Sequence, residues 1–193
     1  MESENVNQAM SQPPHRGSEG GGGSLAALLA AAHREKRAYA GDAERPLGSY
    51  LALMGAYGTL TAGLSAAVWR LDRPLPDPSW SDVALLAVAS HKLSRLIAKD
   101  PVTSPLRAPF TRFKGTSGEA ELAEEVRGQG PRKAIGELIT CPFCLGLWTA
   151  TGFVFGLVLA PRPTRLLAAM FTSLAGADAL QFAYAKLQQA STG

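Results

Sequence analysis

The residues most able to do chemistry are the only two cysteines, Cys141 and Cys144, spaced as C-x-x-C with a proline between them. Such a dithiol could take part in thiol-disulfide exchange, or could supply two of the four ligands of a structural zinc site. A long apolar run follows, so Pro142 is expected in the first turn of a helix, with Thr140 or Cys141 as the cap. The favoured interpretation is a tightly packed helix start, because a thioredoxin-like site would need a βαβ context.

Two further side chains, His91 and Asp178, are candidate helpers of the cysteines in redox or metal chemistry. Both are expected in the cytoplasmic half of an apolar helix, at a depth similar to that of the cysteines. A carboxylate near the bilayer centre costs about 2.5–3.5 kcal/mol, so Asp178 should face a partner, and Arg95 or Lys92 is the natural one. The favoured interpretation of Asp178 is a structural ion pair. The favoured interpretation of His91 is a histidine that is hydrogen-bonded or lies at the membrane interface. No cofactor is expected, and a bound metal is the minor alternative.

Long apolar segments must position these residues. Two of them carry no charge for 22 and 23 residues, which at 1.5 Å per residue is enough to cross a hydrocarbon core about 30 Å thick. Two weaker apolar segments lie beside them and are expected to be membrane helices as well. The sequence therefore predicts an all-α, polytopic membrane protein with a bundle of about four transmembrane helices. The predicted spans are residues 48–69, 83–98, 138–160 and 166–185, in a membrane domain of residues 48–187 followed by a tail at 188–193.

Basic residues orient this bundle. If both termini are cytoplasmic, thirteen Lys and Arg outside the spans lie on the cytoplasmic side and four on the other, as the positive-inside rule requires. A long cytoplasmic loop then covers residues 99–137, and within it residues 118–128 predict a short acidic amphipathic helix. The loop could lie along anionic headgroups or be an ordered connector. Its candidate headgroup contacts are Lys99, Arg107, Arg112 and Lys114.

Residues 1–47 lie before the predicted bundle. Residues 1–24 end in a glycine-rich run and predict a flexible, disordered tail. Residues 25–40 predict a short alanine-rich helix that rests on the membrane surface.

Partners are predicted from surface chemistry. Membrane lipids are expected around the spans, and no stripe of interleaved arginines and aromatics indicates nucleic-acid binding. Gly152 and Gly156 form a G-x-x-x-G pattern, which lets helices approach closely within the bundle, in contact with a protein partner or in self-association of the chain.

Two stretches, RLIAKDPVTSPLRAPF at residues 95–110 and GELITCPFCLGLW at residues 136–148, resemble a bacterial membrane-protein family catalogued as domain of unknown function 1360. The resemblance covers roughly residues 48–187. It implies a small multi-pass protein of the bacterial plasma membrane. It implies no activity, because the family has none assigned.

The leading hypothesis for function is a non-enzymatic interaction or structural role, in which the cytoplasmic loop and the TCPFC helix start form an interaction or lipid-facing surface. The alternative is a membrane thiol-redox or metal-binding protein that uses Cys141 and Cys144, with His91 and Asp178 as helpers.

Overall fold

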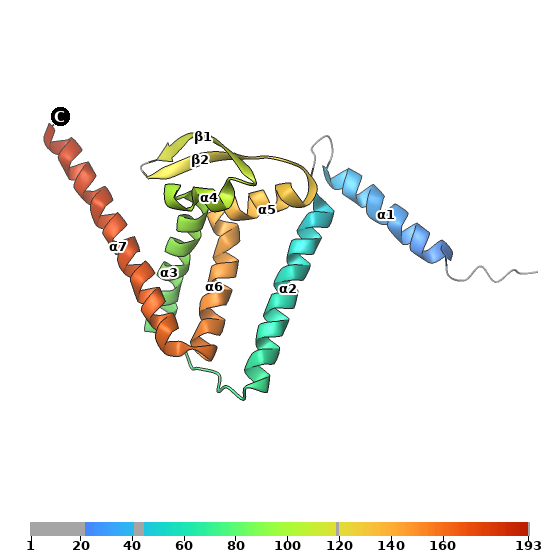
Figure 1. Ribbon diagram of the computed structural model, residues 1–193, viewed down its shortest axis with the longest axis horizontal. Helices are drawn as coiled ribbons and strands as arrows, with labels where there is room; N and C mark the ends of the chain where they lie inside the picture. Colours follow the sequence, from blue (N-terminus) through green and yellow to red (C-terminus); the bar gives the residue numbers. More distant parts are fainter. Residues whose placement is uncertain (1–21, 41–44, 119, 193) are drawn as a thin grey trace, which may run out of the picture. The chain divides into compact units, whose positions relative to one another are not determined.

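The computed structural model of the chain describes residues 22–40, 45–118 and 120–192 (Figure 1). The chain divides into two units, Met1–Arg45 and Pro46–Gly193. In the first unit, helix α1 (Gly22–Ala40) contains the helix predicted at residues 25–40, and its leucines are exposed. The predicted glycine-rich tail lies almost entirely outside the described residues.

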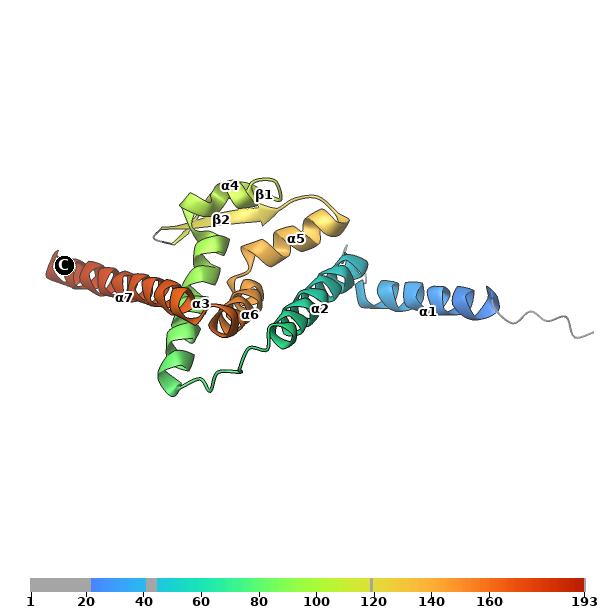
Figure 2. The same ribbon diagram turned by 60° about the horizontal axis from the view of Figure 1, so that its bottom comes forward.

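Four long helices build the second unit: α2 (Leu47–Arg70), α3 (Trp80–Lys99), α6 (Pro142–Leu159) and α7 (Pro161–Thr192). Helix α3 is the central helix and packs against both α6 and α7 (Figures 1 and 2). Helix α2 contacts α6 on the side away from α3. Ala89 of α3 and Ala168 of α7 are fully buried beside Phe153 of α6. Small side chains at such a crossing let helix backbones approach closely.

Among the described residues, three helices are long and apolar enough to cross a membrane, namely α2, α6 and α7. The predicted span at residues 83–98 forms α3, which is not one of the three, because its second half carries polar and charged side chains. The predicted span at 138–160 starts only at Pro142, since a separate helix ends at Thr140. The last helix is longer than predicted and continues through the expected tail to Thr192.

The segment between α3 and α6, residues 100–140, is called the cap below. Its described part contains a 3₁₀ turn η1 (Pro101–Thr103), α4 (Ser104–Arg107), β1 (Thr111–Gly118), β2 (Glu121–Val126) and α5 (Gly130–Thr140). In both ribbon views the cap lies at the end of the bundle where α3 ends and α6 begins (Figures 1 and 2). The predicted long loop is therefore folded, and it positions side chains against the end of α3.

The two strands correct the all-α prediction and the acidic helix predicted at residues 118–128. They form an antiparallel hairpin in which Thr111 pairs with Val126 and Gly118 with Glu121. Strand pairing and the ion pairs between these glutamates and arginines of other elements outweigh the favourable helix propensity of glutamate. Helix α5 packs closely on this hairpin, because a Cβ on Gly136 would lie only 2.6 Å from Cγ1 of Val126.

Candidate functional site

A buried arginine joins the cap to the end of α3. The Arg107 side chain is 0% exposed, and its Nε donates to Oε2 of Glu124 at 2.6 Å, across to strand β2. Nη1 donates to the backbone oxygen of Ile97 at 2.7 Å, and Nη2 to that of Asp100 at 3.0 Å. Nη1 also donates to the hydroxyl of Thr103 at 2.6 Å. One guanidinium thus satisfies the carbonyls at the C-terminus of α3 and a carboxylate of the hairpin.

This position of Arg107 corrects the expectation that it contacts lipid headgroups. A side chain with no exposed surface cannot reach them, and its charge is neutralised by Glu124, which is itself only 7% exposed. A buried arginine needs such a partner, because an unpaired charge in the interior is costly. Arg107 is therefore a structural residue of the cap.

Two more ion pairs hold α3 to its neighbours. Lys92 donates to Asp178 of α7 at 2.5 Å, and Arg95 pairs with Glu121 at the start of β2. Of the two predicted partners of Asp178, the structure thus gives Lys92 that role and directs Arg95 to the hairpin. Lys92 and Arg95 are in this way balanced by acidic residues from α7 and from the cap.

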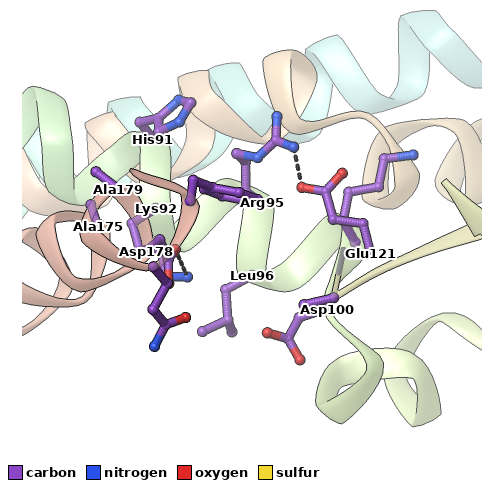
Figure 3. A pocket seen from close by; sticks show the side chains of 13 residues that line it. His91, Lys92, Arg95, Leu96, Asp100, Glu121, Ala175, Asp178 and Ala179 are labelled. Atoms are coloured by element: carbon purple, nitrogen blue, oxygen red, sulfur yellow. Dashed lines mark hydrogen bonds and ion pairs between the residues drawn. The ribbon is translucent and has the colours of Figure 1, made fainter. Parts of the chain in front are cut away.

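A cleft of about 540 Å³ lies between α3, α7 and the turn of the hairpin. Both ion pairs line it, and Figure 3 shows them as separate contacts, with the His91 ring joined to neither. Its apolar walls come from Leu96 of α3 and from small and aromatic side chains of α7. The full lining is His91, Lys92, Arg95, Leu96, Lys99, Asp100, Ala120, Glu121, Ala175, Asp178, Ala179, Gln181 and Phe182.

The cysteines lie elsewhere, at the bend between α5 and α6. Cys141 is the N-cap of α6, and its Sγ accepts a hydrogen bond from the backbone N–H of Cys144 at 3.2 Å. Both thiols are free, and Cys144 is exposed. Neither lines the cleft that holds His91 and Asp178. In the described part of the chain, no three His, Cys, Asp or Glu side chains are grouped so that they could hold a metal ion.

The remaining headgroup candidates lie at the surface of the cap or in the cleft. Lys99 lines the cleft, whereas Arg112 and Lys114 are exposed on β1. Lys114 pairs with Glu125 of β2 at 2.7 Å. This hydrogen-bonded ammonium lowers the pKa of the Glu125 carboxyl below its ordinary value.

The two glycines of the G-x-x-x-G pattern have different surroundings. A Cβ on Gly156 would lie 2.7 Å from the Oγ1 of Thr164, at the corner between α6 and α7. A Cβ on Gly152 would meet nothing within 4 Å, and this residue is exposed. Gly156 therefore serves packing within the chain, and only Gly152 presents an open surface.

With this geometry in place, comparison with known proteins gives a family. The family described as "Protein of unknown function (DUF1360)" matches residues 85–184, which is more than half of the chain. The chain belongs to this family. The segment that matches DUF1360 contains the cysteines, the cap with Arg107, and the whole cleft.

Two relatives of the chain come from Bacillus subtilis (strain 168). Sporulation protein YjcA is 32% identical over 88 residues, which are 44% of this chain and 75% of that protein. UPF0713 protein YngL is 30% identical over 78 residues, which are 40% of this chain and 58% of that protein, less than two thirds of its length. No solved structure matches the chain.

Several polar contacts of this DUF1360 chain were not predicted from its sequence. The carboxylates of Glu121 and Glu124 receive arginines from α3 and α4. Asp82 at the start of α3 accepts from Nε of Arg165 on α7 at 3.0 Å. No local signal indicated these pairs, because Glu121 and Glu124 are three residues apart, a spacing that suits one face of a helix and not one face of a regular strand.

Proposed function

We propose that this protein is a four-span integral protein of the bacterial plasma membrane that acts by non-catalytic binding at its cytoplasmic cap. The observation that supports the proposal is that the cap is folded and held by buried and partly buried ion pairs. Arg107 and Arg95 fasten its hairpin to the end of α3, next to three helices that are apolar enough for a membrane. A folded, ion-paired cap beside apolar helices presents a defined surface to partners on one side of the membrane.

The charges of α3 are compatible with a fourth span. Lys92 and Arg95 lie in its second half, toward the cap, and each has a carboxylate partner. Charged side chains within membrane helices are tolerated when they face the bundle and are paired. Helix α3 has 20 residues, which is about 30 Å of helix and matches the hydrocarbon core. Helices α6 and α7 both pack on α3, and the Lys92 side chain is only 16% exposed, whereas Arg95, one turn nearer the cap, is 42% exposed.

Aromatic residues support the position of the opposite membrane boundary. Trp69 near the end of α2 is 81% exposed, and Trp80 at the start of α3 is 88% exposed. Both stand next to the connection between these helices, at the end of α3 that is remote from the cap. Exposed tryptophans at helix ends are typical of the membrane–water interface. We place this connection outside the cell and the cap, with both termini, in the cytoplasm.

The expected partners are membrane lipids and a second protein, with Gly152 as the open position for helix–helix association; nucleic acid is not among them. The cysteines enter this proposal as the start of α6, because Cys141 uses its sulfur as a helix cap. No observation favours the redox or metal alternative over this role.

The test is complementation of a strain that lacks the gene and shows a measurable phenotype. The variant C141S/C144S should be extracted with the membrane fraction and should restore the phenotype, whereas Arg107→Met should be present in the membrane but fail to restore it. A C141S/C144S protein that inserts normally and does not complement would overturn the non-catalytic role. Recovery of the unaltered chain in the soluble fraction after alkaline extraction would overturn membrane integration.

A further inference from the structure

The α3 wall of the cleft carries three nitrogen-bearing side chains in one row. His91, Arg95 and Lys99 follow one another at i, i+4 and i+8, and all three line the cleft. Residues four apart lie on the same face of a helix, about 5–6 Å from one another between Cβ atoms. The row therefore presents up to three donors along one side of a single cleft.

The acidic residues of the cleft are already occupied. Asp178 accepts from Lys92, Glu121 accepts from Arg95, and Oδ1 of Asp100 accepts the backbone N–H of Val102 at 2.8 Å as the cap of η1. Three acids and three cations line the cleft, so its formal charge is balanced. The balance is uneven in space, because one cation is left without a carboxylate.

That cation is Lys99. Within the described residues, neither its ammonium nor the His91 ring makes a side-chain hydrogen bond or an ion pair. Arg95 uses only Nη2 on Glu121, so Nε and Nη1 of its guanidinium remain for a ligand. Arginine and lysine donors four residues apart suit the oxygens of a phosphate group.

The opposite wall of the cleft is apolar. Ala175, Ala179 and Phe182 of α7 line it, and Phe182 is 51% exposed. Helix α7 is one of the three helices that are apolar enough to cross a membrane. A ligand that fits both walls has an anionic head for the row on α3 and a hydrocarbon tail for α7.

We infer that this cleft binds one anionic phospholipid, with its phosphate on Arg95 and Lys99 and an acyl chain along Ala179 and Phe182. A volume of about 540 Å³ is in the range of small-molecule sites and accommodates a headgroup. Basic pockets between membrane helices on the cytoplasmic side are suited to such headgroups. The inference rests on the proposed membrane placement, which puts the cap end of α3 at the cytoplasmic headgroups.

The experiment titrates purified full-length protein in detergent with dioleoylphosphatidylglycerol, and reads the bound lipid by native mass spectrometry. Dioleoylphosphatidylcholine and inorganic phosphate serve as comparison ligands. Lys99→Gln should weaken phosphatidylglycerol binding about fivefold, the factor expected for one basic residue at an anionic headgroup. Lys114→Gln is the matched control, because Lys114 lies at the same end of the bundle as Lys99 but on the hairpin outside the cleft, and it should leave this affinity unchanged.

The inference would be overturned by equal affinity of the unaltered chain and Lys99→Gln, by an equal loss with Lys114→Gln, or by binding of phosphatidylcholine as tight as that of phosphatidylglycerol. Inorganic phosphate that binds as tightly as the lipid would identify a free anion as the ligand and would also overturn it. Alkaline extraction of the same cells separates this failure from failure of the proposed function, since membrane integration is read there without any added lipid.

Discussion

Replacement of Arg107 by Met should open the cap. The substitution removes the guanidinium and keeps a side chain of similar length, so it leaves the Glu124 carboxylate without its partner while only 7% exposed. It also leaves the carbonyls of Ile97 and Asp100 without the donors that Arg107 supplies. Loss of one partner of a buried ion pair costs about 3–5 kcal/mol. At ~1.4 kcal/mol per factor of ten, the open population of the cap should rise roughly 10²- to 10³-fold or more.

Native-state proteolysis of the purified full-length chain in detergent, at low protease concentration, measures this population, because cleavage follows the open state when opening and closing are fast relative to cleavage. The matched control is Lys114→Met, which breaks the exposed Lys114–Glu125 pair of the same hairpin. Exposed pairs contribute little, so this variant should be cleaved at nearly the rate of the unaltered chain. The double variant R107M/E124M should regain much of the resistance, because apolar replacement of both partners is often tolerated. Equal cleavage of Arg107→Met and Lys114→Met would refute the role given to the buried pair.

Three shorter predictions test other contacts. Asp178→Asn should lower the thermal stability of the detergent-solubilised protein, because Lys92 is left without its carboxylate partner. The double variant K92M/D178L should restore part of this stability, since it removes both charges. No change of stability in Asp178→Asn would argue against a stabilising pair. Gly156→Leu should destabilise the monomer, since even a Cβ would lie 2.7 Å from Thr164, whereas Gly152→Leu should leave monomer stability unchanged and lower only self-association in a cross-linking assay. The pKa of the Glu125 carboxyl, followed by NMR, should be below its ordinary value and should rise in Lys114→Gln. Because the folded-state pKa is depressed, the small stabilisation from this group is fully present above the pKa of the unfolded chain. It is lost as the pH falls through the folded-state pKa. An unchanged Glu125 pKa in that variant would contradict the pairing.

The strongly apolar helices could be predicted from sequence because their signal is local. Uninterrupted apolar runs indicated α2 and α6, and Pro142 indicated the start of α6 with Cys141 as one of two possible caps. The boundary at residue 138 was wrong, because Leu138 and Ile139 continue the apolar run although they belong to α5. Hydropathy does not record the bend that separates two consecutive helices.

The cap could not be predicted because its contacts join residues that are distant in sequence. The hairpin depends on Arg107 reaching Glu124 and on Arg95 reaching Glu121, and neither partner is specified by local periodicity. The same applies to the cleft, where Lys92, and not Arg95, reaches Asp178. The need for a partner at Asp178 followed from the cost of burying a charge, but the choice between two cations one helical turn apart required the packing of α7 on α3.

The side of the membrane on which the hairpin lies tests the four-span arrangement most directly. In a C141S/C144S background, single cysteines replace Asp77 in the connection between α2 and α3 and Ser117 in β1, both of which are exposed. Spheroplasts are then treated with a membrane-impermeant maleimide before and after permeabilisation. The four-span arrangement predicts labelling of D77C in intact spheroplasts and of S117C only after permeabilisation. Labelling of S117C in intact spheroplasts as readily as D77C would show that α3 does not cross the membrane, and would contradict the arrangement.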